Sequence, residues 1–322
     1  MFTKFCLFNL IVGFSALSNA EGKRISQIKC EEYINGVTVT TKFIPLLIEP
    51  IPTVITTYNC SKAVDLIVGG EVAKRGEFRH HLLLGWVTDI PQKYLFDCGG
   101  TLISERYVLT AAHCASKSFG TSPQPSIVRF AELDLTDISS DQFDIPIDTI
   151  IRHPNYSFSR AYNDIALIRL NENVILSKLV RPACLWDDVN TNVSSVIATG
   201  FGRTDHFAQQ GSDTLRKVQL EIIDSSICNA TFRGDRKFKR GMTDQQLCIG
   251  SRDGNRDTCQ GDSGGPIQVL LNPKGCIFHV IGITSTGSKC GGNTPAVYTK
   301  VASYIDWIES EVWGFGVANR GK

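Results

Sequence analysis

Three separate motifs supply a hydroxyl, an imidazole and a carboxylate that could act on one bond. Ser263 stands in Gly-Asp-Ser-Gly-Gly-Pro, residues 261–266, where glycine allows a tight turn and a close approach to another molecule. A serine hydroxyl is a poor nucleophile until a base takes its proton. His113 in Leu-Thr-Ala-Ala-His-Cys and Asp164 in Asn-Asp-Ile-Ala-Leu provide a base and a carboxylate. Together these groups predict nucleophilic attack on an acyl group.

The three motifs, in the order His, Asp, Ser, resemble those of the trypsin/chymotrypsin-like serine proteases over about residues 67–313. The resemblance implies that Ser263 attacks a peptide carbonyl, that His113 transfers the proton and that Asp164 orients the imidazole. It implies no metal or organic cofactor, and the acidic segment 132–142, where some relatives bind calcium, is interpreted as a solvated loop. The histidines outside any motif are interpreted as packed or surface residues: His80, His81, His153, His206 and His279.

The same resemblance assigns positions around the reacting bond. The N–H groups of Gly261 and Ser263 are expected to face the oxyanion. Asp257, six residues before Ser263, is expected at the base of the primary pocket, where it would pair with a substrate Arg or Lys. The alternative is a surface acid in a polar run. The substrate-binding positions that the resemblance implies are Asp257, Ser285, Gly287 and Ala296.

Two of the pocket positions depart from the family pattern. Thr286 stands where relatives usually carry an aromatic residue, so binding of the neighbouring substrate residue is expected to be weaker. Ala296 stands where trypsin has glycine, and its methyl group narrows the pocket. Lower activity and an altered preference between Arg and Lys are both open.

Residues 67–70, Ile-Val-Gly-Gly, resemble the activation site of the family. Cleavage before Ile67 would create an ammonium group, which the resemblance pairs with Asp262 in a buried, charge-assisted contact. The alternative role of Asp262 is a local turn cap. Leu66 precedes the cut instead of Arg or Lys, so we expect activation by an upstream protease with apolar specificity and not by the enzyme itself.

The N-terminal part is expected to be removed or to act as a propeptide. Residues 1–20 contain Lys4, an apolar stretch and small residues at the end, which is typical of a signal peptide and predicts secretion; a buried N-terminal helix is the alternative. Residues 21–66 contain Pro45, Pro50 and Pro52 and are predicted to be an extended, irregular propeptide. The protease part resembles arthropod clip-domain proteases, but Cys30 and Cys60 cannot supply the six cysteines of a clip domain.

Cysteines and sequons fit a secreted chain. Of 11 cysteines, Cys6 lies in the signal peptide, and the remaining even number suggests pairing. The resemblance implies the pairs Cys98–Cys114, Cys228–Cys248, Cys259–Cys290 and Cys60–Cys184, which leaves Cys30 and Cys276 without an assigned partner. The Asn-X-Ser/Thr sequons begin at Asn59, Asn155, Asn192 and Asn229.

Short apolar runs alternate with turn residues after residue 67, which predicts an all-β fold. The resemblance implies two six-stranded antiparallel β-barrels, at about residues 67–180 and 187–300, in a protease domain of residues 67–322. Apolar residues at helical spacing predict a C-terminal helix at about 301–313. His113 and Asp164 would come from the first barrel and Ser263 from the second.

The residues and the resemblance together predict a secreted serine endopeptidase zymogen that cleaves after Arg or Lys in an extracellular immune, clotting or developmental cascade. Expected partners are protein substrates, the activating protease and serpin-type inhibitors. A formal net charge of +1 gives no basic excess for nucleic acid or an anionic membrane. Two alternatives stay open: a digestive trypsin, and a catalytically weak homologue that acts as a binding protein.

Overall fold

The structure is a computed structural model. It describes residues 22–44, 53–59, 70–116, 123–137, 141–203, 210–251, 261–272, 275–287 and 294–314. The predicted positions outside the described residues are the signal peptide, Cys60, Leu66, Ile67, His206, Asp257, Cys259 and Cys290.

The first barrel is a closed ring of six antiparallel strands in the order β4-β5-β6-β9-β8-β7. Successive side chains of strand β4 face opposite sides of the sheet. Both sides are covered, so the strand is buried along nearly its whole length. Leu82, Leu84 and Trp86 enter the barrel core, while Leu83 packs between the barrels. The strands are β4 His81–Val87, β5 Tyr94–Leu102, β6 Tyr107–Thr110, β7 Ile127–Phe130, β8 Phe143–Arg152 and β9 Ala166–Leu170.

The second barrel follows the order β15-β14-β11-β12-β13-β16, and a pairing between β15 and β16 closes it. Its core includes Val196, Ile249, Ile281 and Tyr298. The strands are β11 Ser195–Gly200, β12 Arg216–Ile223, β13 Gln246–Gly250, β14 Pro266–Val269, β15 His279–Thr286 and β16 Ala296–Lys300. Two short strands add to this sheet: β3 (Glu71–Val72) pairs with β12, and β10 (Cys184–Leu185) pairs with β15. The expected pair of six-stranded barrels is therefore confirmed.

The expected C-terminal helix is present as a 3-10 turn followed by α3. Ile305 and Ile308 of α3 pack on the first-barrel core, and Gly314 ends the helix in the left-handed conformation at φ 68°. No helix in the described ranges is long and apolar enough to cross a membrane. The remaining short elements after residue 70 are η1 Cys114–Ser116, α2 Ser225–Thr231, η2 Arg236–Phe238, η3 Val301–Tyr304 and α3 Ile305–Trp313.

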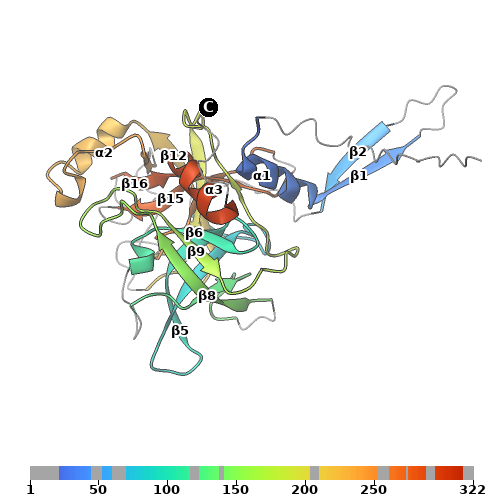
Figure 1. Ribbon diagram of the computed structural model, residues 1–322, viewed down its shortest axis with the longest axis horizontal. Helices are drawn as coiled ribbons and strands as arrows, with labels where there is room; N and C mark the ends of the chain where they lie inside the picture. The colour runs from blue at the N-terminus through green and yellow to red at the C-terminus, as the bar shows by residue number, and fades with distance from the viewer. Residues whose placement is uncertain are drawn as a thin grey trace, which may run out of the picture.

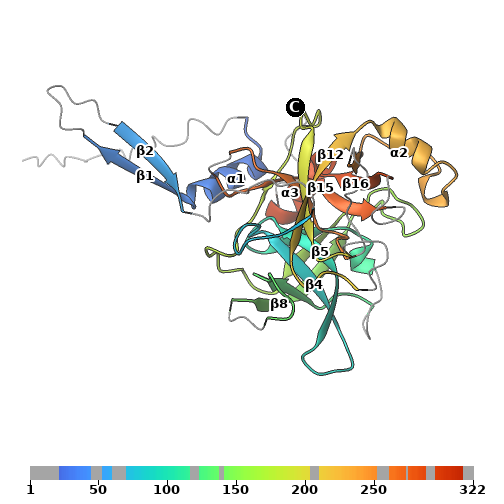
Figure 2. The same ribbon diagram turned by 180° about the vertical axis from the view of Figure 1, so that it is seen from behind.

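The segment before the barrels contains regular structure, which corrects the expectation of an irregular, extended propeptide. Helix α1 (Ile25–Asn35) lies against the barrels, and strands β1 (Thr38–Phe43) and β2 (Thr53–Tyr58) form a hairpin that projects away from them (Figures 1 and 2). Gln27 Oε1 accepts the N–H of Arg24 and so caps the helix start. The prolines that argued against a helix all follow α1.

Helix α1 also corrects one expected disulfide. Cys184 is bonded to Cys30 and not to Cys60, because α1 lies along β10 and brings Cys30 to Cys184. The other described disulfides are Cys98–Cys114 and Cys228–Cys248, the pairings that the resemblance implies. Cys276, left unassigned from the sequence, is disulfide-bonded as well.

Candidate active site

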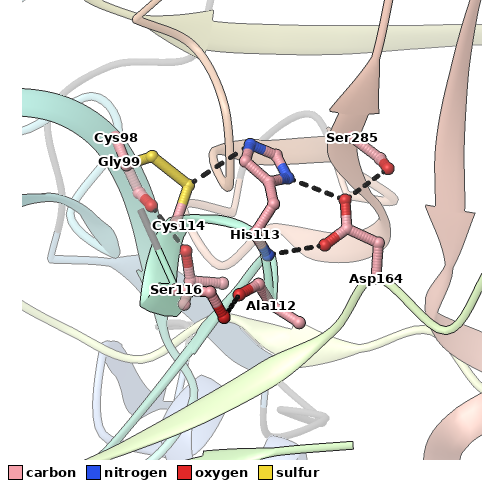
Figure 3. The surroundings of a disulfide bond; sticks show 9 residues. Cys98, Gly99, Ala112, His113, Cys114, Ser116, Asp164 and Ser285 are labelled. Atoms are coloured by element: carbon pink, nitrogen blue, oxygen red, sulfur yellow. Dashed lines mark hydrogen bonds and ion pairs between the residues drawn. A yellow bond between two sulfur atoms is a disulfide. The ribbon is translucent and has the colours of Figure 1, made fainter. Parts of the chain in front are cut away.

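His113 lies just after β6, at the start of the short helix η1. The disulfide between Cys98 of β5 and Cys114 fixes the residue that follows it (Figure 3). The ring is only partly exposed, with 14% of its side-chain surface accessible. Two strands of the first barrel therefore set the position of the imidazole.

Asp164 contacts His113 twice. Its Oδ2 lies 2.7 Å from His113 Nδ1, and its Oδ1 accepts the backbone N–H of His113 at 2.8 Å (Figure 3). A carboxylate can only accept, so Nδ1 carries the proton and Nε2 keeps its lone pair when the ring is neutral. This tautomer is the one that a general base needs.

Other groups hold Asp164 in place, and some of them stabilise its charged form. The hydroxyl of Ser285, on β15, donates to Asp164 Oδ2 at 2.6 Å, and Thr299 Oγ1 donates to the Asp164 carbonyl at 2.8 Å. Burial by itself would raise the pKa of Asp164. The charge of His113 and the hydrogen bonds from His113 and Ser285 outweigh burial and bring the pKa below its ordinary value. The carboxylate thus stays ionised although it is buried.

Ser263 lies on the turn that leads into β14 of the second barrel. Gly261 and Gly264 on this turn have φ of 102° and 77°, a region that favours glycine. A methyl group at Gly264 would lie 2.2 Å from Thr110 Oγ1. The Ser263 carbonyl accepts the N–H of Gly99 on β5 at 2.8 Å. The serine turn is therefore fastened to the same strand that carries the disulfide beside His113.

The structure does not complete the link between the imidazole and the serine. In the part of the chain that is described, no hydrogen bond joins His113 Nε2 to Ser263 Oγ, and Nε2 instead faces Cys114 Sγ at 3.6 Å (Figure 3). His113 and Asp164 are thus brought together, whereas Ser263 is placed on the adjacent turn without a bond to the ring.

The side chain of Asp262 lies beside the end of β11. Its Oδ1 accepts the N–H of Gly202 at 2.8 Å. Methyl groups at Gly200 or Gly202 would lie 2.0 Å and 2.4 Å from its oxygens, so both glycines are needed for its place beside this strand end.

The described part of the expected substrate pocket lies at the junction of β15 and β16. A methyl group on Gly287 would lie 3.7 Å from Ala296 Cβ, and Ala296 is buried at 3% exposure. The structure therefore places Gly287 and Ala296 next to each other, and Ser285 two residues from Gly287 but bonded to Asp164. Asp257 lies outside the described residues.

Sequence reasoning missed how Asp164 is supported. Ser285 was expected only as a substrate-binding residue, and Thr299 was not singled out. Neither stands in a motif with Asp164, since they are 121 and 135 residues away along the chain. Groupings of Cys and His in the described ranges offer no metal site, because each contains a disulfide pair whose sulfurs are already bonded.

Two closed barrels that present a His–Asp pair from one and a glycine-flanked serine from the other define a trypsin-like fold and site. The sequence model of the family described as Trypsin matches residues 67–308. The chain therefore belongs to the trypsin family.

Several curated proteins are similar to the chain over most of its length. Serine protease snk of Drosophila melanogaster is 42% identical over 291 residues, which are 89% of this chain and 65% of that protein. The proclotting enzyme of Tachypleus tridentatus is 35% identical over 84% of this chain and 72% of its own. CLIP domain-containing serine protease B15 of Anopheles gambiae is 34% identical over 89% of this chain and 80% of its own. The chain thus spans just under two thirds of the snk protease.

Proposed function

We propose that this protein is a serine endopeptidase that uses Ser263 as nucleophile and His113 as base. The observation that carries the proposal is the double contact of Asp164 with His113, which fixes the base tautomer beside the serine turn. Once Nε2 meets Ser263 Oγ, the imidazole can take the proton as the oxygen attacks, and later give it to the leaving amine. Asp164 stabilises the imidazolium that forms between these steps.

The tetrahedral intermediate needs donors for its oxyanion. In the described chain, the N–H groups of Gly261 and Ser263 donate to no protein acceptor, so both are available for this purpose. The loss of one such donor typically costs about 10²–10³ in rate. The positive φ of Gly261 supports this role, because it turns the backbone at the point where an oxyanion would bind.

We infer preference for Arg or Lys before the cleaved bond from Asp257, whose position in the motif before Ser263 matches the pocket carboxylate of trypsin-like members. Ala296, beside Gly287, supports a pocket that is narrower than one with glycine at that place. A narrow pocket with a carboxylate at its base suits a long side chain with a terminal charge.

We further propose that the uncut chain is a secreted precursor in an extracellular proteolytic cascade. Relatives named as proclotting enzyme and phenoloxidase-activating factor 3 support a cascade role. Cleavage before Ile67 by a protease with apolar specificity would supply the ammonium group for Asp262.

The test replaces residues 62–66 with an enteropeptidase site, so that cleavage leaves Ile67 as the new N-terminus. The cut protein is assayed with short fluorogenic peptides that carry Arg, Lys, Phe or Leu before the scissile bond, with Ser263→Ala as the control. We expect hydrolysis after Arg and Lys only. Hydrolysis after Phe or Leu alone would overturn the pocket assignment, and no hydrolysis of any peptide would favour a binding protein without activity.

A further inference from the structure

A cavity of about 460 Å³ lies beside the His–Asp pair and has no role in the proposed mechanism. It is formed by the end of β8 and the loop after it on one side, and by the end of η1 on the other. Its lining residues are Ser116, Arg152, His153, Pro154, Tyr156 and Phe158.

The cavity carries one positive charge, that of Arg152. Arg152 is the last residue of β8, and its guanidinium donates to Ser116 Oγ at 3.1 Å. Among the residues that the structure describes, no carboxylate contacts Arg152. The Ser116 hydroxyl donates its own proton to the Ala112 carbonyl at 2.9 Å, which leaves its lone pairs for Arg152. The guanidinium is therefore held in place while most of its donors remain open.

The second basic residue of the lining stays neutral. Burial lowers the pKa of His153 below its ordinary value. Its Nδ1 accepts the N–H of Asn155 at 3.3 Å, and its ring contacts Tyr304 and Trp307 edge-on. The contacts with Tyr304 and Trp307 thus hold the His153 ring in place, and Arg152 is the one charged side chain among the lining residues.

Apolar surface lines the rest of the cavity. Phe158 exposes 66% of its surface, although aromatic side chains of this size are usually more buried. Tyr156 packs against the small cluster of Ala112, Ala115 and Ala166. An open guanidinium next to an exposed aromatic ring suits a ligand that has a carboxylate on an apolar stem, as a Glu or Asp side chain in a peptide has.

The cavity lies close enough to the reacting groups for one substrate to reach both. The N–H of Ser116 donates to the carbonyl of His113 at 3.2 Å, so the cavity begins one turn after the imidazole. Tyr156 packs against the cluster that contains Ala166, two residues after Asp164, so this ring lies near the catalytic carboxylate.

We propose that this cavity is a subsite that binds an acidic side chain of the protein substrate through Arg152. The proposal rests on the proposed function and adds a second recognition element to it. The substrate would then be selected twice, by a basic residue before the cleaved bond and by an acidic residue a few positions away. An exposed ion pair of this kind changes rates modestly, so we expect a preference of about two- to five-fold.

The experiment compares activated enzyme with its Arg152→Ala variant. Both are made in an Asn155→Gln background, because Asn155 begins a sequon next to the cavity and its side chain makes no described contact. The substrates share one Arg at the cleaved bond and carry a single Glu, or Gln as its neutral counterpart, at each of the second to fifth positions on either side. Arg236→Ala serves as the matched control, since Arg236 is an exposed arginine on η2 that does not line this cavity.

We expect kcat/KM to be about two- to five-fold higher for Glu than for Gln at one or two adjacent positions in the parent and in Arg236→Ala. The preference should disappear in Arg152→Ala and weaken with salt. Arg152→Glu should reverse it, so that Gln is preferred to Glu at the same position, and this variant shows that the loss is one of charge and not of folding. Equal rates for Glu and Gln at every position, or a Glu preference that survives in Arg152→Ala, would overturn the subsite while leaving the peptidase activity intact. Failure of all substrates would instead count against the proposed function.

Discussion

At the scale of single residues, Asp164 shows how a buried carboxylate can stay ionised. An isolated ionised carboxylate in an apolar interior would be neutralised by a raised pKa. Here it receives the His113 N–H, the His113 ring and the Ser285 hydroxyl, so its pKa falls instead. The charged state of Asp164 therefore depends on a donor from the second barrel as well as on His113.

We predict that Ser285→Ala lowers kcat of the activated enzyme about tenfold. A hydrogen bond to a charged group contributes about 1.5–3 kcal/mol, and about half of that, expressed in the transition state, gives a tenfold loss. Initial rates on a short Arg peptide at saturating concentration measure the effect. Ser303→Ala is the control, because its hydroxyl is bonded to the Asp244 carbonyl. An unchanged kcat in Ser285→Ala would show that this donor does not support the base.

Two other residues, His80 and His81, make the stability of the fold depend on pH. His80 and His81 are buried between the barrels, where His80 Nε2 meets Gln268 Oε1 and His81 Nδ1 lies 3.2 Å from Thr199 Oγ1. Burial lowers the pKa of His80 to about 4. Burial and the neighbouring His80 lower that of His81 to about 3. Both rings are thus neutral in the folded protein over most of the pH range.

We predict that the free energy of unfolding decreases as the pH falls from about 6.5 to about 4. Over this range the unfolded chain binds protons at both histidines while the folded chain does not. The contribution of the two neutral rings to the free energy of unfolding is therefore fully present above about pH 6.5 and is lost progressively as the pH falls toward about 4. The slope from each residue reaches at most about 1.4 kcal/mol per pH unit. Denaturant unfolding at several pH values should give a shallower slope for the double variant His80→Gln, His81→Gln. Parallel slopes would contradict this assignment.

At the scale of elements, helix α1 is the part of the N-terminal segment that is built into the protease. Arg24 and Ser26 at its start donate to Glu309 of α3, with Arg24 Nη2 at 3.0 Å and Ser26 Oγ at 2.7 Å. Tyr33 is buried at 4% exposure, with its hydroxyl 3.4 Å from the Ile103 carbonyl. The first and last helices of the described chain thus stabilise each other.

We predict that Glu309→Ala lowers the free energy of unfolding by about 2–3 kcal/mol. The side chain of Glu309 is only 10% exposed, and its removal leaves Arg24 and Ser26 without their shared acceptor. Asp306→Ala is the matched control. Asp306 also contacts Arg24 but is 61% exposed, so its loss should cost less than about 1 kcal/mol. Both are measured by denaturant unfolding without reductant. Equal losses of unfolding free energy in the two variants would mean that the buried contact of Glu309 stabilises the fold no more than the exposed contact of Asp306.

Helix α1 also shows where sequence reasoning stopped. Prolines across residues 45–52 argued against a continuous helix, but a short helix before them was overlooked. The apolar and polar residues of α1 have almost no amphipathic pattern, since the helix is held by a disulfide, an ion pair and one buried tyrosine. Such contacts depend on the partner surface, so periodicity in the helix itself could not reveal them.

At the scale of the whole molecule, there is a physical difference between the features that the motifs predicted and those that they did not. Short apolar runs between turn residues predicted an all-β fold, the resemblance of the motifs implied the two barrels, and the motif around His113 indicated its chemistry. The partner of Cys184 and the donor Ser285 instead depend on which distant strands meet. Residues that stand in a motif could be predicted, and partners that only the packing of distant elements brings together required the structure.

The last prediction concerns the covalent organisation of the activated protein. Of the described disulfides, only Cys30–Cys184 joins the chain before the proposed cleavage site at Leu66 to the chain after it. We therefore expect cleavage before Ile67 to yield two chains that still carry a Cys30–Cys184 bond, with α1 docked on α3. Mass spectrometry of a non-reduced digest should contain the linked Cys30 and Cys184 peptides, and the short chain should separate only after reduction. A digest in which Cys184 is linked to Cys60, with Cys30 elsewhere, would show that α1 is not fastened to β10 and would remove the basis for its place in the activated enzyme.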